Sequence, residues 1–157
     1  MKRYYIAYGS NLNLGQMSYR CPGSKVVATS VIEGYELLFK GSKTGSYLTI
    51  EKRSGSHVPV AVWEVTPQDE ARLDRYEGCP AFYYKAEMTL PVEYFSGRRG
   101  RLRCFVYIMH EERKIGVPDM YYFNACMAGY RSFGFDGKVL EAALDKSMEV
   151  CDEDRPV

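Results

Sequence analysis

Short segments rich in aromatic and β-branched residues dominate the sequence, and they limit its possible folds more than any other feature. Such residues favour β-strands, and the glycines and prolines between the segments are typical of turns. The last segment also alternates between an apolar face and a face that mixes charges with aromatic rings, as a half-buried strand does. The predicted strands are 2–8, 25–32, 35–39, 47–52, 59–65, 83–93 and 101–110.

Helical signals are fewer, and they do not alternate regularly with the strands. Thr66 and Pro67 form an N-cap followed by a proline at the first helical position, which predicts a helix over 67–76. The other predicted helices are a short turn after Asn13, a helix over 118–129 and a third that Asp136 caps. This arrangement indicates an α+β protein whose sheet curls strongly or closes into a small mixed β-barrel with flanking helices.

Length and composition narrow the class of protein. The 157 residues fit one domain, 1–157, and the net charge of +1 gives no reason to expect a nucleic-acid partner. No apolar run approaches the ~18 residues of a membrane span, and the N-terminus does not resemble a signal peptide. Five scattered cysteines without a C-x-x-C pair argue against a metal site and suit a reducing compartment. We therefore expect a cytoplasmic protein, either a monomer or a homodimer.

The run Tyr8-Gly9-Ser10-Asn11-Leu12 ends the first predicted strand. As a strand-to-helix turn it needs no function, because glycine and asparagine tolerate positive φ and serine forms local hydrogen bonds. A turn of this kind also exposes backbone N–H groups that can hold a carboxylate or a developing oxyanion. These residues alone leave both interpretations open.

Glu77 lies at the C-terminal end of the predicted helix 67–76, where unpaired carbonyl groups disfavour a carboxylate. If residues 78–82 fold back over it, the side chain loses water and its pKa rises, as a proton-transferring carboxylate requires at neutral pH. At a fraying helix end it would be an ordinary surface residue.

Three further groups have structural and functional interpretations. Cys79 with His57 or His110 could form a thiol nucleophile and its base, although a half-buried cysteine beside a proline turn is far commoner. The basic cluster at 96–103 is interpreted as a solvated hairpin tip rather than a nucleic-acid surface. Aromatic residues within 118–130 have the spacing of core positions on a helix, but one hydroxyl could reach a pocket.

Taken in chain order, several motifs together resemble the γ-glutamylcyclotransferase-like family. The similarity covers nearly the whole chain. The motifs are YGSNL at 8–12, Met17 with Arg20-Cys21-Pro22, VAVWEV at 60–65 leading to Leu73-Asp74 and Tyr76-Glu77-Gly78, Tyr83-Tyr84-Lys85, and a later tyrosine followed by Gly129-Tyr130.

The resemblance implies a small β-barrel with flanking helices, a substrate cavity under the YGSN loop, and a glutamate after the Leu-Asp element as the acid/base residue. Carried onto this chain, Glu77 is the catalytic residue. The substrate-binding residues are Tyr8, Gly9, Ser10, Asn11 and Leu12. A further aromatic contact comes from Tyr121 or Tyr122, and the spacing favours Tyr121.

The implied reaction acts on a γ-glutamyl amide or γ-glutamyl amino acid and releases 5-oxoproline and the free amine. Such a substrate carries its own nucleophile, the α-amine, so we expect neither a cofactor nor a covalent intermediate. We expect Glu77 to move the protons and the amides of 9–12 to hold the substrate carboxylate or the oxyanion. The alternatives are a non-catalytic small-carboxylate or protein-binding domain on the same scaffold, and a Cys79-dependent hydrolase.

Overall fold

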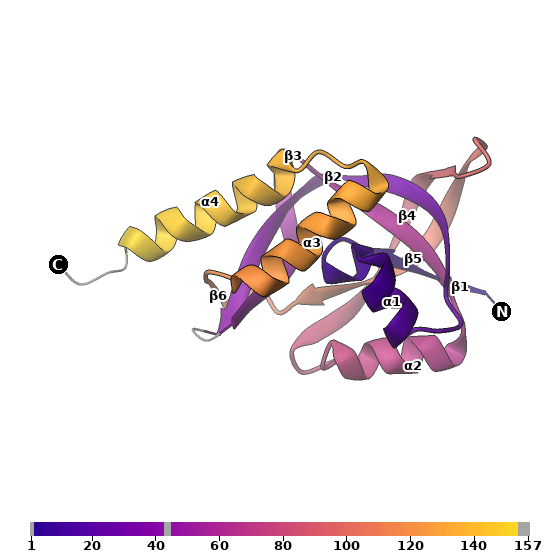
Figure 1. Cartoon of the computed structure of the whole chain (residues 1–157), viewed down its shortest axis with the longest axis horizontal. Helices are drawn as coiled ribbons and strands as arrows, with labels where there is room; N and C mark the ends of the chain where they lie inside the picture. Colours follow the sequence, from indigo (N-terminus) through magenta and orange to yellow (C-terminus); the bar gives the residue numbers. More distant parts are fainter. Residues whose placement is uncertain (1, 43–44, 154–157) are drawn as a thin grey trace.

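The computed structural model describes residues 2–42 and 45–153, and five of its strands close into a barrel (Figure 1). Around the barrel the strand order is β3, β1, β5, β4 and β2, and the pairing of β2 with β3 closes the barrel. The bounds are β1 (Arg3–Ala7), β2 (Lys25–Ser42), β3 (Gly45–Val65), β4 (Tyr83–Tyr94) and β5 (Arg99–Met109). Only the β1–β5 pair in the ring is parallel, so the barrel is mixed, as the sequence predicted.

The strands β2 and β3 are much longer than the sequence predicted, because each joins two predicted strands. The register shifts between the pairs Glu33–His57 and Tyr35–Lys52, so Gly34 lies opposite residues 53–56 of β3. Gly34 has a φ of 76°, and Gly55 has a φ of 85°. These glycines bend the hairpin without ending it, since glycine adopts positive φ at little cost. Beyond the ring, β2 also pairs with β6 (Lys114–Ile115), which was not predicted.

The helices begin close to where the sequence predicts. In α2 (Pro67–Tyr76), Thr66 and Asp69 form a reciprocal capping box, and Asn13 caps α1 (Leu14–Arg20). The amide of Lys138 donates to Asp136 at the start of α4 (Lys138–Glu153). The prediction was wrong at the end of α3 (Met120–Phe133), which continues through Gly129 and ends at Gly134 in the left-handed conformation.

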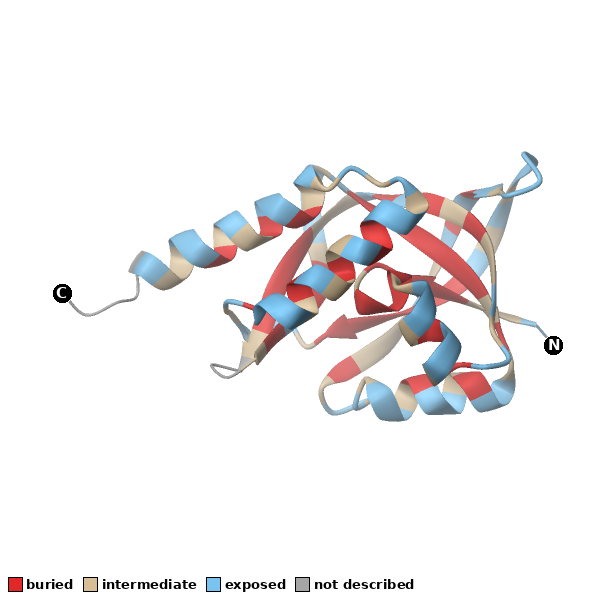
Figure 2. Ribbon diagram, in the orientation of Figure 1, coloured by how far each residue is buried: buried red, intermediate tan, exposed pale blue. Residues whose placement is uncertain are grey.

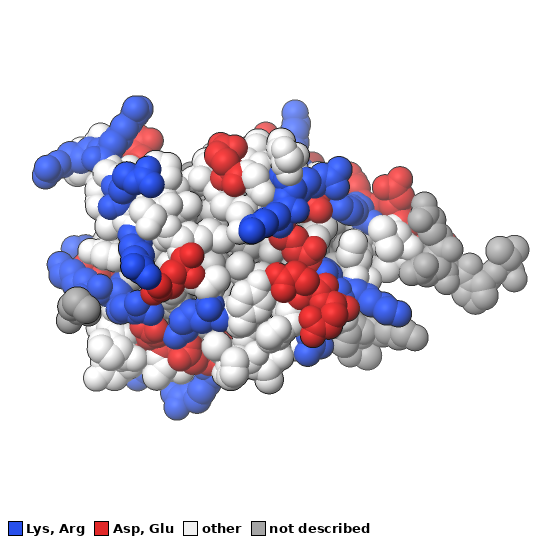
Figure 3. All heavy atoms as spheres, turned by 180° about the vertical axis from the view of Figure 1, so that it is seen from behind, with Lys and Arg blue, Asp and Glu red and all other residues white. Residues whose placement is uncertain are grey.

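One continuous core fills the barrel and extends beneath the helices (Figure 2). The helix α3 packs on the 3-10 turn η1 (Ser10–Leu12), α1 contacts η1 and α2, and α4 lies along β2 and extends beyond the barrel (Figure 1). On the face turned away in Figure 1, basic and acidic side chains are interspersed (Figure 3). No helix within the described ranges is long and apolar enough to cross a membrane.

Candidate active site

The loop after β1 forms one side of the candidate site. The amides of Leu12 and Asn13 donate to the carbonyl oxygens of Gly9 and Ser10, both at 3.0 Å, which closes the η1 turn. The amides of Gly9, Ser10 and Asn11 have no acceptor among the described residues. The amide of Leu12 already donates to the carbonyl oxygen of Gly9. The expected anion-binding site therefore has three available backbone donors, the amides of residues 9–11.

Glu77 is the residue after α2, and the chain folds back directly after it. Gly78 has a φ of 61°, and the amide of Phe82 donates to the Gly78 carbonyl oxygen at 2.8 Å. The turn leaves Glu77 half-buried, and none of the described residues donates a hydrogen bond to its carboxylate. Burial raises the pKa of Glu77 from 4.5 to about 7, while the nearby charge of Arg20 lowers it.

A cavity of about 340 Å³ lies between the loop and Glu77, within the size range of small-molecule sites. Of the residues predicted for the site, the cavity wall includes Tyr8, Gly9, Ser10, Asn11 and Glu77. The wall also contains Tyr5, Tyr47, Leu48, Arg75, Tyr76, Gly78, Phe82, Tyr83, Tyr107 and Tyr122.

Two predicted binding residues do not line this cavity. Leu12 is fully buried beneath the loop, where a Cβ atom added to Gly129 would lie 2.6 Å from it. Tyr121 is 84% exposed, and the tyrosine that reaches the cavity is Tyr122. The expectation for Tyr121 is therefore corrected by one residue, because successive side chains on a helix point in directions about 100° apart.

Tyrosine hydroxyls form much of the cavity wall, and several are fixed on the backbone. Tyr8 donates to the carbonyl oxygen of Tyr107 at 2.6 Å, and Tyr83 donates to that of Leu48 at 2.8 Å. The hydroxyl of Tyr122 accepts from the amide of Leu48 at 3.0 Å. The sequence did not assign Tyr5, Tyr83 or Tyr107 to the site. Tyr83 belongs to the motif Tyr83-Tyr84-Lys85, whereas for Tyr5 and Tyr107 the only signal was the high tyrosine content, 14 residues.

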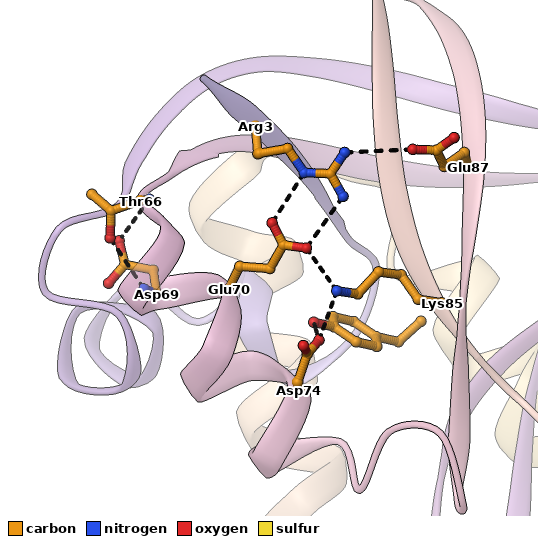
Figure 4. Close-up of polar contacts among 8 residues, drawn as sticks. Arg3, Thr66, Asp69, Glu70, Asp74, Lys85 and Glu87 are labelled. Carbon is orange, nitrogen blue, oxygen red and sulfur yellow. Dashed lines mark hydrogen bonds and ion pairs between the residues drawn. The ribbon is translucent and has the colours of Figure 1, made fainter. Parts of the chain in front are cut away.

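A chain of ion pairs fastens α2 to the barrel beside the cavity (Figure 4). Lys85 on β4 contacts Glu70 at 2.6 Å and Asp74 at 2.9 Å, and Arg3 on β1 contacts Glu70 at 3.0 Å. The hydroxyl of Tyr107 donates to Asp74 at 2.6 Å. Asp74 lies one helical turn before Glu77, so these contacts hold the end of α2 in place.

The other predicted groups do not line the cavity. Cys79 is half-buried and its pKa is raised, chiefly by burial, so its thiol stays protonated. Neither histidine lines the cavity. His57 on β3 lies opposite Glu33 on β2 in the strand register, and the His110 ring contacts the Pro80 carbonyl oxygen. The turn 95–98 joins β4 to β5, which confirms the hairpin prediction. Within the described ranges, no His, Cys, Asp and Glu side chains are grouped to hold a metal ion.

Known proteins are similar to this chain in sequence and in fold. Residues 5–123 match the model of the family described as "Gamma-glutamyl cyclotransferase, AIG2-like". A Bos taurus "Gamma-glutamylcyclotransferase" is 28% identical over 132 residues, covering 78% of this chain and 68% of the bovine protein.

Solved structures share the fold. A structure named "Gamma-glutamyl cyclotransferase" superposes with a TM-score of 0.76 at 23% identity, covering 91% of this chain and 86% of the other. An uncharacterized protein from Homo sapiens gives a TM-score of 0.74 at 22% identity, covering 90% and 86%. Since the family model spans most of the sequence, the chain is an enzyme that belongs to the gamma-glutamyl cyclotransferase, AIG2-like family.

Proposed function

We propose that this enzyme converts a γ-glutamyl amide or γ-glutamyl amino acid into 5-oxoproline and the free amine, and that Glu77 moves the protons. The observation that carries the proposal is a half-buried carboxylate without a protein partner among the described residues, in one cavity with three free backbone amides. A group with a pKa of about 7 is suited to accept and return a proton at neutral pH.

The reaction begins when the Glu77 carboxylate takes a proton from the α-ammonium group of the substrate. The freed amine attacks the γ-carbonyl carbon, and the new C–N bond closes a five-membered ring. As the tetrahedral intermediate collapses, Glu77 returns its proton to the leaving nitrogen and the bond to that nitrogen breaks. The ring nitrogen then gives up its second proton, which Glu77 passes to the freed amine. Overall the attacking nitrogen loses two protons and the leaving nitrogen gains two, so no co-reactant is consumed.

The other cavity residues hold the substrate in the folded-back form that ring closure needs. The amides of Gly9, Ser10 and Asn11 supply donors for anionic oxygen, and the hydroxyl of Tyr122 lies close to Gly9. Holding the amine against the carbonyl group accelerates the reaction because the entropic cost is met on binding. The aromatic rings of the wall lower the local polarity, which strengthens these hydrogen bonds.

The test is an assay for 5-oxoproline over a panel of γ-glutamyl amides and γ-glutamyl amino acids. We expect turnover of at least one compound, and we expect Glu77→Gln to lower kcat about 10²-fold or more while ligand binding persists. Glu141→Gln, the same change at an exposed position on α4, is the matched control. A wild-type protein that binds these compounds but never produces 5-oxoproline would instead be a binding domain on this scaffold.

A further inference from the structure

Arg20, the last residue of α1, does not line the cavity but contacts two residues that do. Its guanidinium group donates to Oδ1 of Asn11 and lies 3.7 Å from the centre of the Tyr76 ring. A planar guanidinium group that both stacks and donates has little freedom to turn. Arg20 therefore fixes the position of the Asn11 carboxamide.

The orientation of the Asn11 side chain decides the role of Tyr5. Because Oδ1 faces Arg20, the amide nitrogen is left to donate to the Tyr5 hydroxyl, at 2.9 Å. The Tyr5 oxygen is thus an acceptor, and within the described ranges nothing accepts its own proton. Burial raises the pKa of Tyr5 well above its ordinary value, so the phenol keeps that proton at neutral pH.

We propose that Arg20, Asn11 and Tyr5 form a hydrogen-bond relay that supplies the cavity with a side-chain donor for the α-carboxylate of the substrate. Arg20 acts as a positioning residue, and Tyr5, which lines the cavity, is the group that touches the substrate. The inference rests on the proposed cyclisation.

Charge and chemistry both favour the α-carboxylate as the partner of Tyr5. The charged residues of the described cavity wall are Glu77 and the exposed Arg75, so a bound carboxylate needs further compensation. A cation at one end of a hydrogen-bond chain polarises every donor in it, and Arg20 stands at that end. Glu77 lies close enough to Tyr5 to raise its pKa further. Since the α-amine and α-carboxylate share one carbon, a donor beside Glu77 reaches the carboxylate when Glu77 reaches the amine.

The experiment measures kcat and KM for turnover, and the Kd of 5-oxoproline, which retains the carboxylate. We expect Tyr5→Phe and Arg20→Gln each to raise KM and Kd about 10- to 100-fold, with kcat changed only a few-fold. Asn11→Asp keeps an acceptor for Arg20 but loses the donor to Tyr5, so it should match Tyr5→Phe. If the three residues act as one unit, the Tyr5→Phe/Arg20→Gln double variant should bind no more weakly than the weaker single variant.

The controls are Tyr4→Phe on the same strand and Arg53→Gln, an arginine that pairs with Glu36 in the β2–β3 hairpin. Both should leave KM and Kd unchanged, and thermal unfolding verifies that every variant is folded. Unchanged Kd values in Tyr5→Phe and Asn11→Asp, or fully additive losses in the double variant, would overturn the relay. If the wild-type protein binds 5-oxoproline but turns over no substrate, the proposed function is wrong. The Kd values of 5-oxoproline for the wild type and the variants would still test the relay. A wild-type protein that neither binds nor turns over would reject both.

Discussion

Adding a single methyl group at Gly129 tests the contact that positions the loop 8–12, which we propose binds anionic oxygen. Gly129 is buried on α3, and an added Cβ would lie 2.6 Å from the carbonyl carbon and the Cβ of Leu12 and 2.8 Å from the amide nitrogen of Asn13. Carbon atoms in contact are normally about 3.5–4.0 Å apart, so the helix and the loop must separate by about 1 Å. Two of these atoms are backbone, and the Cβ of Leu12 does not move when its side chain rotates, so no side-chain rotation relieves the clash.

The free-energy balance for Gly129→Ala has two opposing parts. Alanine is about 1 kcal/mol better than glycine inside a helix, which favours the variant. Overpacking a well-packed contact typically costs up to about 3 kcal/mol. We expect a net loss of about 2 kcal/mol, which corresponds to a fall in Tm of about 4–8 °C for a chain of this size. We also expect KM for a γ-glutamyl substrate to rise, because the displaced backbone carries the amides of η1.

Gly15→Ala is the matched control, because Gly15 also lies in a helix but has open space around it. Its added Cβ would meet only Oδ1 of Asn13, at an ordinary 3.5 Å. This variant should be unchanged or more stable by up to about 1 kcal/mol, with an unchanged KM. Thermal unfolding and steady-state kinetics on both variants decide the matter. The reasoning is refuted if Gly129→Ala is as stable and as active as the wild type.

Four other predictions concern Glu77, the tyrosines of α3 and Cys79. The pKa of Glu77 is about 7 in the folded protein, above its ordinary 4.5. Between these pH values the folded protein holds a proton on Glu77 that the unfolded chain has lost, so the folded protein loses stability as the pH rises through 7. Glu77→Gln should therefore be more stable than the wild type by about 3 kcal/mol at pH 8, and this difference should vanish toward pH 4.5. Thermal unfolding measures the difference, and an equal value at pH 8 and pH 4.5 would contradict the burial of the charge. Turnover by the wild type should fall as the pH drops below about 7, since the carboxylate form is the base. Tyr122→Phe should raise KM several-fold, whereas Tyr121→Phe, at an 84% exposed position, should not. Cys79→Ala should keep full turnover, which would eliminate the Cys79-dependent hydrolase. Loss of activity in this variant, together with rapid inactivation of the wild type by thiol alkylation, would support the hydrolase hypothesis instead.

Local sequence signals predicted the elements that depend on neighbouring residues. The start of α2 was predictable because Thr66, Pro67 and Asp69 form its cap within four residues. The position of Glu77 at the end of that helix followed directly. By contrast, Gly34 and Gly55 are compatible with either a turn or a bulge, and only the pairing of β2 with β3 along their length decides between them. The lengths of these strands therefore could not be read from short segments.

The desolvation of Glu77 depended on tertiary structure in the same way. Its place in the sequence fits a surface residue and a buried base equally well, and the fold-back of residues 78–82 made the difference. The relay from Arg20 to Tyr5 joins α1, η1 and β1, and no sequence spacing records which way a carboxamide turns. Long-range packing thus fixes the parts of the site that control its electrostatics.

The choice between Tyr121 and Tyr122 depends on which face of α3 meets the η1 turn. Residues seven apart on a helix lie on nearly the same face, two turns away from each other. Tyr122 is seven residues before Gly129, and the buried Cys126 lies between them on the same face. Because Gly129 has no side chain, this face of α3 can approach the η1 turn. Tyr121 instead begins a stripe that continues through the exposed positions 124, 128 and 131. The sequence predicted that the helix ends at Gly129. A glycine inside a helix can also allow a close contact with another segment. The face of α3 that carries Gly129 also carries Tyr122, and this face lies against the loop.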